Sequence, residues 1–514
     1  MLKKIKKYQV QILLSLIFLL ALVLRFWWFP ENIYFGYDQA RDAFVSQEIY
    51  QNKDFKIIGP SAGKEGLYHG PLYWYLIGPV YLLFQGNPAG PLAFISLLNA
   101  LGVFLVYYFG KNLFDQKTGL FAAVLYSFFF SQTQYSLYFA NPAPAVLSIS
   151  AYFLGWTLLL LKNKPWAWIL IGLGLGLSIQ FEFFLVYLGI CCLIFPILFF
   201  RSFKENLNLK FLALGILSFI ASVSSFILAE LKYGFRTTKT LFSVLTFVSS
   251  PGSGEKMATS TFLGRLGEEV RFGLVGLNSS YNNYLALGFI ALFVYVFLKK
   301  KEDRKKLLIP FVWIASNLFV DFFGSPQLYY VNIGVSVSII LFIAYLFSKI
   351  WTFKKAVAIL AVVFLAFNNL SFAQKYNPKG PINTLYVQEG MLLQDEKKIV
   401  DLIYQDAGGK EFTVNALIMP YNIKTTWAYL FNWYGKREYG YVPYWGGEDV
   451  PGYAGQMPLP TSPSLVRYAI YEPERGISVE LKKIFVDGEN GFGKPVVREE
   501  IGQFVMEKRV PTSE

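Results

Sequence analysis

The sequence contains very little histidine and cysteine. Its 514 residues include one histidine, His69, and two cysteines, the adjacent Cys191 and Cys192. One histidine excludes a metal site built from several histidines, and two adjacent cysteines do not make a disulfide framework. We interpret the cysteines as small buried apolar residues. No motif indicates a cofactor, and a divalent metal is left open because no cluster of ligand residues has a typical spacing.

Charged residues are also scarce. They make up 16% of the sequence, against 54% hydrophobic and 18% aromatic residues. This composition is too apolar for a soluble protein of this length. The apolar residues come in blocks of roughly 17 to 23, the length of helix that crosses about 30 Å of hydrocarbon. The sequence therefore predicts a polytopic α-helical membrane protein.

Eleven apolar blocks are predicted to span the membrane. The first follows four lysines and has no small-residue cleavage site, which favours an uncleaved anchor. The segment Pro71 to Phe84 is apolar but short, so we expect an interfacial or re-entrant pair of short helices there. The eleven predicted spans are Val10 to Phe29, Pro88 to Gly110, Thr118 to Gln134, Pro142 to Leu161, Pro165 to Phe181, Phe183 to Phe200, Phe211 to Ala229, Tyr281 to Leu298, Leu307 to Phe323, Leu328 to Phe347 and Ala356 to Ala373.

The formal net charge is +13, but many of the basic residues lie in short loops and form no basic domain that would bind nucleic acid. Lysine and arginine occur in alternate loops, for example at Lys162 and Lys164 and in the run Lys299 to Lys306. The positive-inside rule places these loops and the N-terminus in the cytoplasm. The chain is thus predicted to lie in the cytoplasmic membrane, with the intervening loops outside.

The predicted outer side carries most of the aqueous part of the chain. Residues 1–373 form the predicted transmembrane domain, with a first outer loop at 30–87 and a second large outer segment at 230–280. Residues 374–514 are richer in charge, glycine and proline, and predict an extracytoplasmic soluble α/β domain. Its predicted elements are helices at Met391 to Ala407 and Thr426 to Tyr434, and strands at Phe412 to Met419, Val466 to Tyr471 and Phe504 to Glu507. Chemistry or recognition is expected on this face.

The first outer loop contains the pattern of an amphipathic helix between Tyr34 and Ile49. At helical spacing, Asp38, Arg41 and Asp42 share one face. A carboxylate such as Asp38 can accept a proton from a hydroxyl, and Arg41 can keep it ionised or bind a phosphate. The alternative interpretation is an ordinary helix N-terminus, where acidic residues are favoured.

The second half of the loop has the sequence Tyr68-His69-Gly70-Pro71-Leu72-Tyr73-Trp74-Tyr75. The only histidine thus stands before a Gly-Pro turn and an aromatic cluster. A lone histidine is more often structural than functional, and the aromatic cluster is also typical of a membrane interface.

Together, the Asp38-x-x-Arg41 helix after the first span and the later Pro71-Leu72-Tyr73 turn resemble the first outer loop of GT-C superfamily glycosyltransferases. The similarity is greatest to the bacterial group that contains protein O-mannosyltransferases and lipid A aminoarabinose transferases. It covers mainly residues 8–200, and the later segments agree in topology. The resemblance implies transfer of a sugar from a polyprenyl-phosphate donor to a protein, lipid or glycan acceptor.

The resemblance also implies roles for individual residues. The acid corresponding to Asp38 is the family's proposed catalytic residue, so Asp38 would deprotonate or orient the acceptor hydroxyl in an inverting displacement. The other candidates, for substrate or phosphate binding, are Arg41, Asp42, His69, Asn141, Glu182, Arg236, Arg271, Asp321, Tyr329 and Tyr330. Each has a structural alternative: a solvated surface charge for the loop cations, water contact at the interface for Glu182 and Asp321, and an aromatic belt for the tyrosines.

Three positions depart from the family pattern. Relatives often have Lys-Pro-Pro or His-Pro-Pro where this sequence has His69-Gly70-Pro71, so a phosphate-binding lysine is absent. Asn141 occupies a position at which many members have a second acid. Glu182 places a carboxylate where relatives often have a polar residue.

Two other classes of protein fit part of the sequence. A polytopic transporter or flippase of lipid-linked saccharides would need ionisable residues near the middle of the bilayer and broken helices in matched positions, and neither is evident. A receptor or assembly scaffold would leave the pattern of the first outer loop unexplained. The sequence therefore favours a glycosyltransferase.

Overall fold

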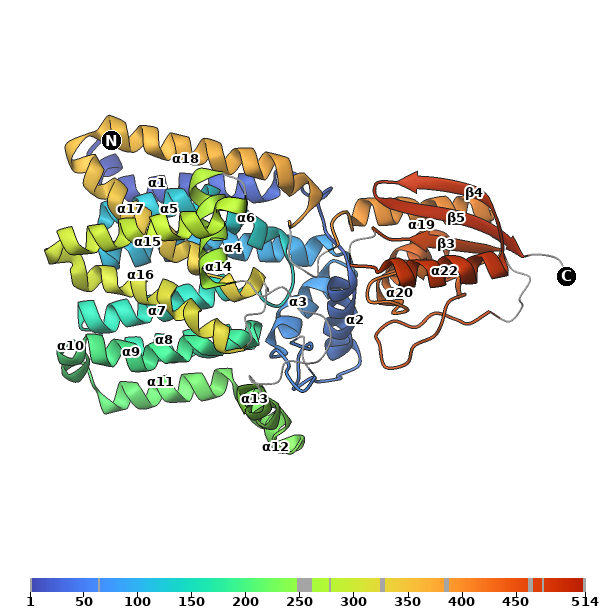
Figure 1. Ribbon diagram of the computed structural model, residues 1–514, viewed down its shortest axis with the longest axis horizontal. Coiled ribbons are helices and arrows are strands. Elements are labelled where there is room, and N and C mark those ends of the chain that lie inside the picture. Colours follow the sequence, from blue (N-terminus) through green and yellow to red (C-terminus); the bar gives the residue numbers. More distant parts are fainter. Residues whose placement is uncertain are drawn as a thin grey trace.

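The computed structural model describes residues 2–62, 65–246, 261–276, 279–323, 329–382, 388–460, 466–473 and 476–511. Its long helices run side by side in a bundle, and a β-sheet lies beyond one end of that bundle (Figure 1). Two shorter helices, α2 (Tyr37–Gln51) and α3 (Leu72–Leu83), lie between the bundle and the sheet. The first loop, which contains these two helices, therefore lies between the helical bundle and the sheet.

Six helices of the described residues are long and apolar enough to cross a membrane, and the bent pair α11 and α12 makes seven if it is counted as one span. The break between these two helices bends the chain by 57°. The six are α1 (Leu2–Phe26), α4 (Ala89–Leu113), α7 (Ala145–Lys162), α15 (Asn282–Lys299), α17 (Val335–Phe353) and α18 (Lys355–Tyr376), and the bent pair is α11 (Leu209–Ser222) with α12 (Ser224–Lys232).

The predicted count of eleven spans is not confirmed, because several apolar blocks are broken into shorter helices. Phe129 adopts an extended backbone and separates α5 (Gln116–Phe128) from α6 (Phe130–Leu137) inside one predicted span. Hydropathy reports the length of an apolar block and not where its backbone hydrogen bonding changes. The other shortened blocks are α8 (Ala167–Phe181), η1 (Phe183–Ile190) with α9 (Cys191–Leu198), and α16 (Arg304–Ser316) with η5 (Asn317–Phe323).

Shorter helices connect these elements. The segment predicted to be interfacial or re-entrant contains α3, a helix of 12 residues with Pro79 inside it. The remaining helices before the sheet are α10 (Phe200–Glu205), α13 (Arg236–Thr246), α14 (Phe262–Val270), η2 (Arg271–Val275), η3 (Ser279–Tyr281), η4 (Lys301–Asp303), η6 (Tyr329–Asn332) and η7 (Asn377–Lys379).

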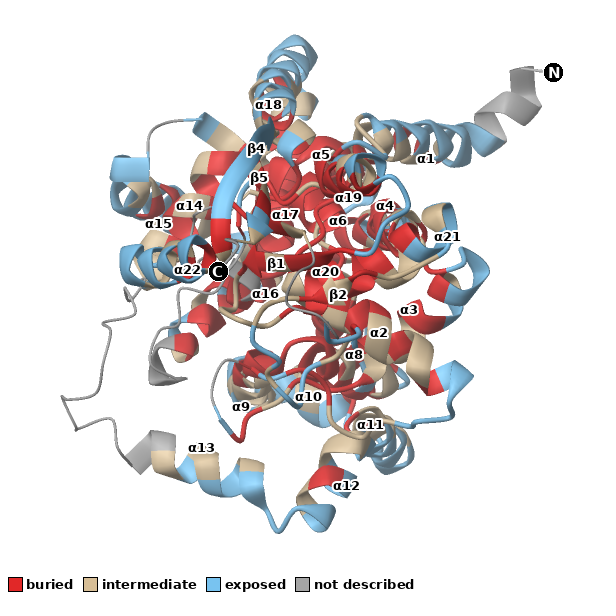
Figure 2. Cartoon of the chain, turned by 90° about the vertical axis from the view of Figure 1, so that its right-hand side faces the viewer, coloured by how far each residue is buried: buried red, intermediate tan, exposed pale blue. Residues whose placement is uncertain are grey.

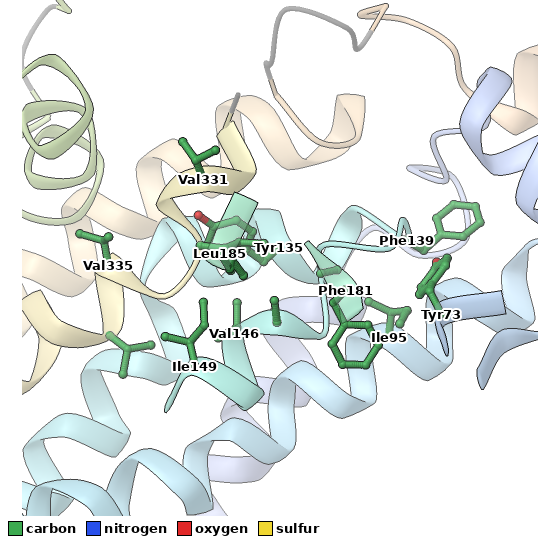
Figure 3. Close-up of a cluster of buried hydrophobic side chains, with 14 of the residues drawn as sticks. Tyr73, Ile95, Tyr135, Phe139, Val146, Ile149, Phe181, Leu185, Val331 and Val335 are labelled. Atoms are coloured by element: carbon green, nitrogen blue, oxygen red, sulfur yellow. The ribbon is translucent and has the colours of Figure 1, made fainter. Parts of the chain in front are cut away.

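The core of the bundle is apolar and aromatic, and buried residues fill its centre (Figure 2). Near the site described below, Tyr73, Ile95, Phe139 and Phe181 gather in one buried cluster (Figure 3). Apolar side chains are also exposed on the outer surface of the bundle, such as Phe367 on α18, which is 72% exposed. Outward-facing apolar side chains on helices of this length are what contact with lipid requires.

The C-terminal residues form a five-stranded sheet in the order β2-β1-β3-β5-β4. β1 pairs parallel with β2 and β3, whereas β5 pairs antiparallel with β3 and β4. The predicted helices and strands of this region are present, although whether it is an independent domain stays a prediction. The elements are α19 (Leu393–Ala407), β1 (Thr413–Leu417), α20 (Thr425–Leu430), η8 (Phe431–Gly435), α21 (Lys436–Tyr439), β2 (Tyr444–Trp445), β3 (Arg467–Tyr471), α22 (Val479–Phe492), β4 (Gly493–Ile501) and β5 (Phe504–Pro511).

Candidate active site

Helix α2 presents the predicted trio of charged side chains. It begins after Gly36, whose extended backbone N–H donates to Oε1 of Gln39 at 3.2 Å. Asp38 lies in the first turn, where the positive end of the helix dipole favours a carboxylate. Arg41 Nη1 donates to Asp38 Oδ1 at 2.6 Å, and Arg41 Nη2 donates to Asp42 Oδ1 at 2.7 Å. Arg41 therefore bridges the two carboxylates, as the helical spacing predicts.

The two carboxylates differ in their surroundings. The side chain of Asp38 is 43% exposed, whereas that of Asp42 is 1% exposed. Burial raises the pKa of Asp42 to about 6, although the positive charge of Arg41 acts to lower it. Trp74 of α3 donates its indole N–H to Asp42 Oδ1 at 2.7 Å. Asp42 is thus a buried anchor, and Asp38 is the carboxylate that an incoming molecule can reach.

His69 lies beside the start of η1. Its Nδ1 accepts a hydrogen bond of 3.1 Å from the backbone N–H of Phe183, so the proton of the neutral ring is on Nε2. Burial, followed by the positive charge of Arg41, lowers the pKa of His69 to about 3. The carboxyl of Glu182 is 3.7 Å from Nδ1. Because Nδ1 accepts a hydrogen bond, the His69 ring is neutral, and His69 and Glu182 do not form an ion pair.

The departure at Gly70 has a structural cause. Gly70 donates its backbone N–H to the carbonyl of Gln180 at 2.9 Å, and a proline at this position would have no N–H to donate. A Cβ atom at Gly70 would lie 1.8 Å from Oε1 of Gln180. The close contact between the first loop and the end of α8 therefore requires glycine where relatives often have proline.

Asn141 and Glu182 also gather at the end of α8. Asn141 Nδ2 donates to the carbonyl of Phe181 at 2.7 Å. Glu182 is fully buried, so the alternative in which it reaches water at the interface is wrong. Its Oε1 accepts from the N–H of Phe184 at 3.1 Å, and its Oε2 has no partner among the described residues. The structure thus brings Asn141, Glu182 and His69 together.

A cavity of about 260 Å³ opens beside His69. Arg236 lines it and pairs with Glu65 at 2.8 Å. Glu230 also lines it, but its two oxygens accept from the N–H groups at the start of α13, so it is a helix cap. The full lining is Ile57, Ile58, Tyr68, His69, Phe226, Ala229, Glu230, Tyr233, Arg236 and Thr237.

One predicted residue that the structure describes, Arg271, is not joined to this group. Arg271 lies on η2, where it stacks on the ring of Phe272 at 4.0 Å and is 3.7 Å from Glu268. No described contact connects it to α2 or to the cavity. The side chains of Asp321, Tyr329 and Tyr330 lie outside the described residues, so their proposed roles stay predictions.

Two residues beside the charged trio, Trp74 and Tyr138, are not evident as site residues from the sequence. Trp74 was interpreted only as part of an interfacial aromatic cluster, although its N–H bonds Asp42. Tyr138, at the end of α6, was not singled out; burial, followed by the charge of Asp38, raises its pKa well above the usual value. Within the described residues, no group of three or more His, Cys, Asp or Glu side chains could hold a metal ion.

Comparison with known proteins finds one family model that matches part of the chain, and solved structures with a similar fold. Residues 68–228 match the family model described as dolichyl-phosphate-mannose-protein mannosyltransferase. No curated protein matches significantly. The structure of ArnT from Cupriavidus metallidurans in the apo state has a TM-score of 0.60 at 11% identity, covering 96% of this chain and 97% of that one.

Two further solved structures are similar. ArnT from the same organism, bound to undecaprenyl phosphate, has a TM-score of 0.60 at 12% identity and covers 96% of this chain and 98% of that one. The oligosaccharyltransferase of Archaeoglobus fulgidus, tethered with an acceptor peptide, has a TM-score of 0.52 at 14% identity and covers 82% and 63%. At these identities the likeness shows the fold.

Proposed function

We propose that the chain is a GT-C type membrane glycosyltransferase that takes its sugar from a polyprenyl phosphate, with Asp38 as base. The match of residues 68–228 to a mannosyltransferase family model and the ArnT-like fold support this proposal. The observation that carries the proposal is the exposed Asp38 carboxylate, held by Arg41 at 2.6 Å beside the buried Asp42. A fixed and accessible carboxylate is what general-base catalysis needs.

The proposed reaction is a single displacement. The acceptor hydroxyl gives its proton to Asp38 while its oxygen forms a bond to the anomeric carbon of the donor sugar. The bond between that carbon and the phosphate oxygen breaks, and the polyprenyl phosphate leaves with the electron pair. Since attack and departure occur on opposite sides of the carbon, the anomeric configuration inverts.

The leaving phosphate needs cations and hydrogen-bond donors. Arg41 borders Asp38, and Arg236 lines the cavity together with His69. With Nδ1 bonded to the N–H of Phe183, the neutral His69 has its Nε2–H left as a donor. We propose that these groups take the part of the family's phosphate-binding lysine, which is absent here.

The nature of the lipid carrier is proposed from the relatives. ArnT from Cupriavidus metallidurans was crystallised with undecaprenyl phosphate, and the Archaeoglobus fulgidus enzyme is an oligosaccharyltransferase tethered with an acceptor peptide. We propose an undecaprenyl-type donor for this chain. The acceptor belongs to one of the three classes that the sequence leaves open, namely protein, lipid or glycan.

The site is proposed to face the outside of the cytoplasmic membrane. α2, α3 and the sheet lie at one end of the bundle (Figure 1). Several helices of the bundle end in lysine, such as α7 at Lys162 and α15 at Lys299. The positive-inside rule places those helix ends in the cytoplasm.

The test is the release of polyprenyl phosphate by purified protein from undecaprenyl-phosphate-linked mannose, glucose and aminoarabinose. Asp38→Asn is expected to lower kcat by about 10²- to 10⁴-fold, the usual contribution of a general base. Asp54→Asn is the matched control, because Asp54 is 53% exposed in the same loop and, among the described residues, pairs with Lys56. Equal release by wild type and Asp38→Asn refutes the role of Asp38. No release from any donor, with transport of lipid-linked sugar across vesicles, refutes the transferase.

A further inference from the structure

Helix α2 is held between two different parts of the chain. On one side it packs against α3, where Gly78 leaves room for the backbone of Ser46 and for the ring of Tyr50. On the other side it packs against α20 of the C-terminal region. The helix that carries Asp38 is therefore fixed by residues that lie far from it in the sequence.

One residue of α20, Tyr429, makes several contacts with the first loop. Tyr429 of α20 is 2% exposed. Its ring packs edge-on against Phe44 of α2, with the ring centroids 5.0 Å apart, and also lies 5.4 Å from Phe35, in the segment before α2. Tyr81 of α3, at 6.4 Å, and Trp433, at 6.0 Å, are further aromatic neighbours. The Tyr429 ring thus touches the start and the middle of the loop that forms the site.

The hydroxyl of Tyr429 adds two hydrogen bonds. It donates to the carbonyl of Gly86 at 2.6 Å and accepts from Nε2 of Gln47 at 3.1 Å. Gln47 lies on α2, and Gly86 follows α3. A single side chain therefore ties both helices of the first loop to the sheet region, with a donor and an acceptor that are both satisfied.

Neighbouring residues support the same contact. Trp433 donates its indole N–H to the carbonyl of Gln85 at 3.0 Å. Gly455 has a φ of +92°, and a Cβ atom there would lie 2.8 Å from the ring of Phe44. The surface that receives α2 is thus closely fitted, so a displacement of Tyr429 is transmitted to α2.

We propose that Tyr429 is a positioning residue that holds α2, and with it Asp38 and Arg41, in the geometry required for transfer; the inference rests on the proposed function. Tyr429 touches neither the sugar nor the phosphate. It acts by fixing the helix on which the base stands. The C-terminal region is accordingly part of the active-site architecture.

The test compares Tyr429→Ala with Tyr404→Ala, each beside its phenylalanine variant. Tyr404 is 3% exposed, lies in the same region, donates one hydrogen bond of 2.6 Å to the carbonyl of Tyr441, and has no described contact with α2. Tyr429→Ala is expected to lower kcat about 10- to 100-fold with KM changed by less than about threefold, because small misplacements of a base cost rate and not binding. Tyr429→Phe, which keeps the ring, is expected to recover most of kcat.

Hydrogen exchange supplies a readout that needs no activity. The amides of residues 37–51 are expected to exchange faster in Tyr429→Ala than in Tyr404→Ala. Equal losses of kcat in the two alanine variants, or unchanged exchange of residues 37–51 in Tyr429→Ala, overturn the inference. If wild type transfers no sugar, the proposed function fails, and the exchange data alone decide whether Tyr429 holds α2.

Discussion

The indole N–H of Trp74 donates a hydrogen bond of 2.7 Å to Oδ1 of Asp42, the same oxygen to which Arg41 donates. Trp74 lies on α3, and Asp42 lies on α2. A chain of hydrogen bonds therefore runs from Trp74 on α3 through Asp42 and Arg41 to Asp38, so the position of α3 affects the position of Asp38. The other oxygen of Asp42 has no partner among the described residues. A buried carboxylate that is only half satisfied makes this site sensitive to protonation.

The first prediction concerns pH and the variant Asp42→Asn. Burial raises the pKa of Asp42 in the folded protein from 3.8 to about 6. The stability contributed by the protonated carboxyl is present below about pH 4 and is lost as the pH rises through 6. The thermal midpoint of wild type, relative to Asp42→Asn, should therefore fall between pH 4 and pH 6 and stay constant above that range. If the midpoint of wild type rises relative to that of Asp42→Asn between pH 4 and pH 6, the pKa of Asp42 is not raised as stated.

The second prediction concerns His69→Lys, which installs the lysine often found in relatives. In the wild type the Phe183 N–H donates to Nδ1 of His69, whereas the lysine ammonium has no acceptor to offer it. The ammonium would also add a positive charge near Arg41. Leaving the Phe183 N–H unsatisfied is expected to cost about 1–3 kcal/mol of folding free energy. His69→Asn is the control, because its side-chain oxygen can still accept. Unfolding midpoints measure both, and a His69→Lys variant as stable as wild type refutes the argument.

The third prediction concerns orientation. Single cysteines at Lys117 and Lys494, in a chain without Cys191 and Cys192, report the two sides of the membrane; Lys117 lies on α5, and Lys494 lies on the exposed strand β4. An impermeant maleimide added outside intact cells should label position 494 and leave position 117 unlabelled. The opposite pattern places the site in the cytoplasm.

Local patterns in the sequence were sufficient for part of this structure. The spacing of Asp38, Arg41 and Asp42 predicts their common face, because helical neighbours meet at three and four residues. Strands β1 and β3 follow from short buried apolar runs. Strand β4 was not predicted, since it contains Pro495 and exposes most of its side chains at the edge of the sheet.

The contacts that complete the site join segments far apart in the chain. The hydrogen bonds from Trp74 to Asp42, from Phe183 to His69 and from Gly70 to Gln180 depend on how the helices pack. Periodicity contains no information about which helix faces which. The broken spans were missed for a related reason, because a change of backbone direction such as that at Phe129 leaves hydropathy unaltered.

The contact between α2 and Tyr429 joins two residues that are translated at different times. Asp38 is translated early, whereas the tyrosine that clamps its helix comes 391 positions later. At about 5–20 residues per second, the interval is roughly 20 to 80 s. During that time α1 and the helices after it enter the membrane, while the helix that carries the proposed base lacks its contact with Tyr429. We therefore expect the nascent chain to complete the proposed site only once its C-terminal region has been released and has folded onto α2.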